Sequence, residues 1–206
     1  NDLPYIQIYS MIISLIIAAL IFFVEKKCNM NMILRTLITK ESKINFIKAI
    51  TVLIMNSAIY FFIVLIYSAL IWSVFGLEGW HMKIQTSYLF WLSPLNINYF
   101  QAYMVNVLIG YLAVLVVTFF TSLLVKMNEK KYIGELLSIL FIFIPFMFNN
   151  YSFFGFFPSN VIQLSRNVLN FSWINGINSI YLEFIALLCV AILLFLLVCR
   201  KNRKKA

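Results

Sequence analysis

The sequence predicts an all-α integral membrane protein built as a polytopic helical bundle, and three observations lead to this fold class. Of the 206 residues, 63% are hydrophobic and 11% are charged, with a mean hydropathy of +0.94. A soluble domain is typically about 45–50% apolar and about 25% charged. The apolar residues also form long stretches, and the Lys and Arg residues gather in alternate connections. So few charged residues cannot cover so large an apolar core, and the bilayer must therefore act as part of the solvent.

Five apolar stretches are candidates for membrane spans, because a span needs about 20 apolar residues to cross roughly 30 Å of hydrocarbon. The fourth stretch is short and carries Pro145 near its end, so a continuation through non-helical backbone would have to be packed inside the protein. No connection is long enough to build an independent core. We expect a single transmembrane domain over residues 1–206, with spans at about 6–24, 49–75, 102–125, 133–148 and 180–198.

The basic residues define the topology. Six lie in the connection 25–48, three in 126–131 and five in the tail 200–205, whereas the other connections hold only Lys83 and Arg166. By the positive-inside rule the segments 25–48, 126–131 and 200–205 are cytoplasmic. The C-terminus is then cytoplasmic and the N-terminus lies outside.

This topology leaves the N-terminus to be translocated without a signal peptide, in a chain that starts with Asn1 and not with Met. A preceding helix with a cytoplasmic N-terminus would resolve both points. We therefore expect six spans in the intact protein.

The net charge of +9 does not indicate nucleic-acid binding. The charges lie beside hydrophobic spans, where each gains about 1 kcal/mol from anionic lipid headgroups, and no soluble domain offers a basic groove. The cysteines are Cys28, Cys189 and Cys199, none of them in an outer connection, so no disulfide framework is expected. Their spacing fits no metal site.

The cytoplasmic connection 25–48 contains a helical pattern. A short amphipathic helix lying along the membrane surface is expected here, with Thr39 as a plausible N-cap for the helix that follows. Such a helix could receive motion from a soluble partner, or it could be an ordinary connector on the headgroups. Its apolar face holds Met30, Ile33, Leu34 and Leu37, with Arg35 elsewhere.

The outer segment 149–179 is rich in aromatic residues, which are typical of the headgroup level. An apolar-periodic run follows Pro158 and predicts a short helix at, or dipping into, the outer interface. One interpretation is a gate over a path between helices, and the other is an interfacial aromatic belt. The candidate gate residues are Phe153, Phe154, Phe157, Pro158 and Trp173.

No motif predicts catalysis, a cofactor or a metal site. His81 is the only histidine, and His-Glu-x-x-His, Gly-x-Ser-x-Gly and phosphate-binding glycine loops are absent. Glu135 and Glu183 lie within spans but about one turn from an end, which disfavours a proton relay. Asn56 with Ser57, and Asn106 with Gly110, are interpreted as positions for hydrogen bonding and close packing between helices.

Two short stretches resemble permease subunits of the ABC-2 family of ABC transporters, which includes bacteriocin-immunity and peptide-export permeases. The first span ends in Phe22, Phe23 and Glu25, and Lys48 enters the second span. Between them lies the stretch Arg35-Thr36-Leu37-Ile38-Thr39-Lys40, and before the last span lies Phe157-Pro158-Ser159-Asn160. The basic tail is also similar to the family pattern.

This resemblance implies a bacterial plasma-membrane subunit that is not itself an enzyme and exports an amphipathic peptide or lipid-like substrate. The helix at 30–37 would then be a coupling helix that docks into a separate ATPase subunit, and a second permease subunit, identical or different, would complete the path. The alternative is a polytopic sensor or assembly protein without transport activity.

Overall fold

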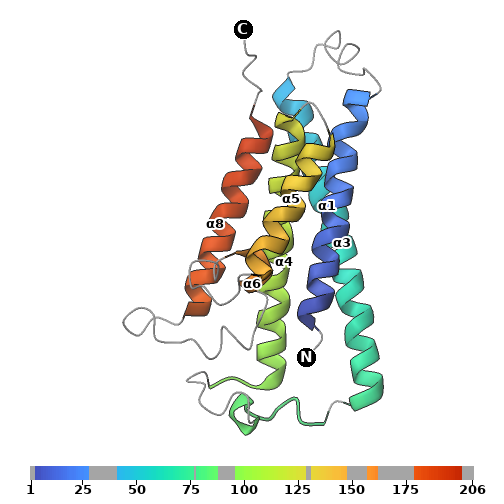
Figure 1. The fold of residues 1–206 in the computed structure, drawn as a ribbon. Coiled ribbons are helices and arrows are strands. Elements are labelled where there is room, and N and C mark those ends of the chain that lie inside the picture. The colour runs from blue at the N-terminus through green and yellow to red at the C-terminus, as the bar shows by residue number, and fades with distance from the viewer. Residues whose placement is uncertain are drawn as a thin grey trace.

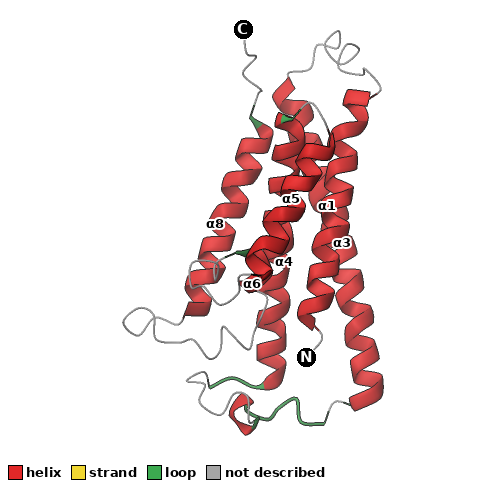
Figure 2. Ribbon diagram, in the orientation of Figure 1, coloured by secondary structure: helices red, strands yellow, loops and turns green. Residues whose placement is uncertain are grey.

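The computed structural model describes residues 3–27, 41–76, 78–87, 96–128, 131–147, 157–161 and 179–200. Within these ranges the regular secondary structure is helical, and Lys83 and Asn98 form an isolated β-bridge. Figures 1 and 2 show long helices that run side by side, up and down. The helices are α1 (Leu3–Lys27), α3 (Glu41–Phe75), η1 (Ile84–Thr86), α4 (Tyr99–Met127), α5 (Lys131–Met147), α6 (Pro158–Val161) and α8 (Ser179–Cys199).

Three of the described helices are long and apolar enough to cross a membrane: α1, α3 and α4. Two shorter apolar helical stretches lie in α5 and α8. The expectation of an all-α membrane protein is therefore confirmed in the helical structure, length and apolar composition of these helices. The total number of spans and their orientation remain predictions.

Helix α4 lies at the centre of the bundle and packs against α1, α3, α5, α6 and α8. In its apolar stretch 67% of the residues are buried, against 44% in α1 and 28% in α3. The peripheral helices bury one stripe each, because residues three or four positions apart lie on the same face of a helix. On α3 this stripe consists of Asn45, Ala49, Val52, Asn56, Tyr60, Val64 and Ser68, spaced three or four residues apart.

The remaining surface of α3 is strongly apolar. Phe62, Leu65, Leu70 and Val74 are each at least 60% exposed. An apolar surface of this extent is stable against lipid and would be unfavourable in water. The stripe and the exposed face together are typical of a helix that lies between protein and bilayer.

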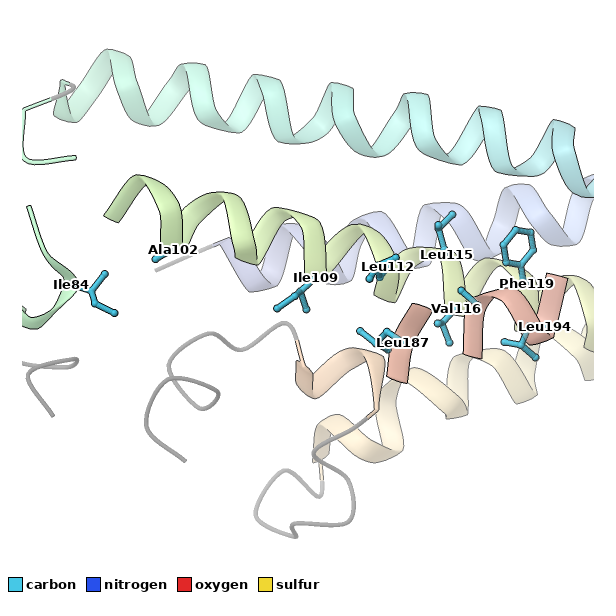
Figure 3. Packing of buried hydrophobic residues seen from close by; sticks show 10 residues of the cluster. Ile84, Ala102, Ile109, Leu112, Leu115, Val116, Phe119, Leu187 and Leu194 are labelled. Atoms are coloured by element: carbon cyan, nitrogen blue, oxygen red, sulfur yellow. The ribbon is translucent and has the colours of Figure 1, made fainter. Parts of the chain in front are cut away.

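The core contains an apolar cluster between α4 and α8, which Figure 3 shows from close by. Ile109, Leu112 and Val116 of α4 pack with Leu187 and Leu194 of α8 in this cluster. A second cluster joins α1, α3 and α4, and a third joins α1, α3, α4 and α8 near the C-terminal end of α8.

Two helix boundaries have local explanations. Helix α3 begins at Glu41, eight residues before the apolar stretch predicted from residue 49. Lys43 and Lys48 lower the hydropathy of these first residues. They are nevertheless helical, because the buried stripe of α3 already includes Asn45. At the start of α4 the backbone N–H of Asn98 donates to Gln101 Oε1 at 3.0 Å, which satisfies a donor that has no partner within the helix.

Candidate functional site

Three amide side chains that are at most 2% exposed lie inside the described part of the bundle, one on each of α1, α3 and α4. They are Gln7, Asn56 and Asn106, with exposed fractions of 0%, 0% and 2%. A buried polar group is costly unless it is hydrogen-bonded, and no lipid can supply that bond. These three residues, called the amide cluster below, are therefore the main candidate for a functional site among the described residues.

Gln7 joins α1 to both neighbouring helices. Its Nε2 donates to the backbone carbonyl of Asn106 at 3.1 Å and to Tyr60 Oη at 3.4 Å. The Tyr60 hydroxyl in turn donates to the carbonyl of Val107 at 2.7 Å. This chain of hydrogen bonds connects α1, α3 and α4 at one level of the bundle.

Gly110 makes this contact possible. A Cβ atom at position 110 would overlap Gln7 Nε2 and would lie 2.7 Å from Tyr60 Oη. Only a residue without a side chain therefore lets Gln7 and Tyr60 approach the backbone of α4 so closely.

Asn56 makes a second connection between the same helices, one turn of α3 away from Tyr60. Its Nδ2 donates to the carbonyl of Ser14 on α1 at 3.3 Å and to Thr118 Oγ1 on α4 at 3.0 Å. The Thr118 hydroxyl donates to Val114 O at 2.7 Å, so its oxygen is an acceptor for Asn56. Both N–H groups of the Asn56 amide are used.

Two Ser–Tyr pairs strengthen the contact between α3 and α4. Ser57 Oγ lies 2.7 Å from Tyr111 Oη, and Ser68 Oγ lies 2.5 Å from Tyr103 Oη. Each serine hydroxyl donates to a carbonyl of its own helix at 2.7 Å, so the tyrosine is the donor in both pairs.

The amide cluster also contains acceptors that have no donor. Gln7 Oε1, Asn56 Oδ1 and Asn106 Oδ1 are buried and have no hydrogen-bond partner within the described part of the chain. In Gln7 and Asn56 the opposite end of the amide faces backbone carbonyls, so exchanging O and N would place two acceptors against each other. The unpaired atoms of these two amides are therefore oxygens.

Helix α6 is a separate feature of the bundle. It packs against α4 and α5, and the ring of Phe157 lies 5.4 Å from that of Phe141, which stacks on Phe120 at 4.3 Å. Pro158 and Ser159 are buried. Two of the predicted gate residues, Phe157 and Pro158, thus lie against the bundle, while Phe153, Phe154 and Trp173 lie outside the described residues.

The other predicted residues are placed only in part. Met30, Ile33, Leu34, Arg35 and Leu37 lie outside the described residues. Glu135 is half-buried on α5, and Glu183 belongs to α8 although its side chain is not described.

Sequence reasoning missed Gln7 and Tyr60. Gln7 is the second residue of the expected span 6–24, where a polar residue is ordinary, and Tyr60 is one of 11 tyrosines. The signal that could have identified them is a glutamine within one apolar helix together with Gly110 within another apolar helix. A glycine leaves room for a larger polar side chain from the neighbouring helix.

Among the described residues no group of His, Cys, Asp and Glu is arranged to hold a metal ion. The chain matches no family model, no curated protein and no solved structure.

Proposed function

We propose that the chain is a membrane-spanning permease subunit of an ABC transporter of the ABC-2 type in a bacterial plasma membrane. It passes an amphipathic peptide or lipid-like substrate outward when a separate ATPase subunit binds and hydrolyses ATP. The C-terminus is cytoplasmic, and a second permease subunit, identical or different, completes the path.

The observation that supports this proposal most is the mechanical connection of the helices that flank residues 28–40. Helices α1 and α3 lead into and out of this segment, and both are joined to the central helix α4 through the amide cluster. Near the same end, Phe22, Ala49 and Val125 pack in one apolar cluster. A displacement of the connection would therefore be transmitted to α4 through packed side chains and hydrogen bonds.

The segment itself carries the amphipathic pattern and the ABC-2-like stretch, and it lies within the connection 25–48, which holds the largest group of basic residues. A partner that docks there and changes shape with its nucleotide state would bias the bundle between two arrangements. It can do so only through its different affinity for each arrangement.

The direct test is co-purification of an ATPase with the tagged, full-length protein extracted from its native membrane in mild detergent. We expect a nucleotide-binding subunit to co-purify with the wild-type chain. Leu34→Arg should abolish this association, because the substitution places a charge on the apolar face of the proposed coupling helix.

Met82→Arg is the matched control. Met82 lies in the connection between α3 and α4 and is 58% exposed, so the same change in chemistry should leave the association intact. Co-purification of the ATPase with Leu34→Arg at the wild-type level would contradict the proposal. Recovery of a sensor kinase in place of an ATPase would favour a sensor or assembly protein.

A further inference from the structure

The unpaired oxygens of the amide cluster indicate a bound partner that donates hydrogen bonds. Gln7 Oε1, Asn56 Oδ1 and Asn106 Oδ1 come from three helices, and each is buried without a donor among the described residues. A buried polar group without a partner in the protein calls for an explanation, and an ordered water molecule is one such explanation. Each would lose its hydration on folding and gain nothing in return.

The charge of the described core restricts the chemistry of the partner. The amide nitrogens of Gln7 and Asn56 bond to neutral groups, and the buried residues that the structure describes include no Asp or Glu. A cation would be buried there without a counter-charge, which is strongly unfavourable in a membrane interior. A small neutral donor meets no such penalty.

We propose that water molecules occupy this interface and donate hydrogen bonds to Gln7 Oε1, Asn106 Oδ1 and Asn56 Oδ1. A water molecule has two donors, and buried water typically bonds to polar groups that are otherwise unsatisfied. The interface of α1 with α3 and α4 is thus a hydrated polar site inside an apolar bundle. This inference does not depend on the proposed transport function.

Radiolytic hydroxyl-radical labelling of the purified full-length protein in detergent tests the site, because side chains next to ordered water are labelled even where bulk solvent is excluded. Tyr60 and Met11, which are 1% and 0% exposed and belong to one core cluster, should be labelled. Phe119, 2% exposed in the apolar cluster between α4 and α8, is the dry reference. Labelling of Tyr60 no greater than that of Phe119, after correction for intrinsic reactivity, would overturn the proposal.

The variant Gln7→Met gives a second, independent measurement because Met keeps the length of the side chain. In a hydrated site the loss of the amide removes an acceptor for water, so the substitution should decrease the labelling of Tyr60. The melting temperature should fall in either case, because Gln7 Nε2 bonds to Asn106 O and Tyr60 Oη. Labelling of Tyr60 that stays at the wild-type level would contradict hydration.

Thr51→Val is the control for this pair of measurements. Thr51 is exposed on α3, and its hydroxyl bonds to Ile47 O of its own helix. Its replacement should leave both the melting temperature and the labelling of Tyr60 near the wild-type values.

Discussion

Lys126 Nζ, near the end of α4, donates a 2.7 Å hydrogen bond to the backbone carbonyl of Val198, near the end of α8. The same ammonium also donates to the carbonyl of Arg200. Carbonyls in the last turn of a helix have no partner within that helix, and the C-terminal end carries partial negative charge. A single cation from one helix therefore satisfies and stabilises the end of another, although Lys126 is only 9% exposed.

Lys126→Met should consequently destabilise the protein. We expect a loss of about 1–2 kcal/mol, since the substitution keeps the aliphatic packing and removes the ammonium from the helix end. The measurement is the thermal unfolding midpoint in detergent. Lys83→Met, at an exposed position in the connection before α4, should leave the midpoint unchanged, and an equal effect of the two variants would refute a specific role for Lys126.

Gly110→Ala should be strongly destabilising. The added methyl group would overlap Gln7 Nε2 and crowd Tyr60 Oη, and overpacking of this kind typically costs about 1–3 kcal/mol. The double variant Gln7→Ala with Gly110→Ala removes the overlap, so the two substitutions should not be additive. Additive shifts of the unfolding midpoint would show that the contact between Gln7 and Gly110 does not limit the approach of α1 to α4.

The hydrogen bond from Asn56 to Thr118 can be tested with a matched pair of substitutions. Thr118 and Thr121 are both fully buried on α4, and both hydroxyls bond to a carbonyl four residues earlier. Only Thr118 also accepts from Asn56. Thr118→Val should therefore cost about 1 kcal/mol more than Thr121→Val, measured as the difference in their unfolding midpoints. Equal costs would mean that the Asn56 bond contributes no net stability.

The helices could be predicted from the sequence because hydropathy is a local property. The expected stretch 102–125 lies within α4, which extends over Tyr99–Met127. The start of α3 was missed because hydropathy detects apolar residues and not helical backbone, and Glu41, Ser42 and Lys43 are helical but polar.

The amide cluster could be predicted only in part. Asn56 and Asn106 are recognisable as polar residues within apolar stretches, but their partners are set by packing between distant segments. Asn56 meets Ser14 and Thr118, which are 42 and 62 residues away in the chain. No local pattern specifies which faces of α1, α3 and α4 meet, so the role of Gln7 and its contact with Gly110 are visible only in the folded bundle.

Phe141 should hold α6 against the bundle, because its ring lies between those of Phe120 and Phe157. The substitution Phe141→Ala removes both ring contacts, and a partly buried aromatic side chain contributes about 2–3 kcal/mol in such a place.

The readout is the maleimide reactivity of Ser159→Cys, in a background where the three native cysteines are replaced by serine. Ser159 is 0% exposed, so a cysteine there should react slowly in the parent and at least about tenfold faster with Phe141→Ala, since 1.4 kcal/mol corresponds to a factor of ten. Phe143→Ala, which truncates an exposed ring on the same helix, should leave the reaction slow, and a fast reaction already in the parent would contradict the buried placement of α6.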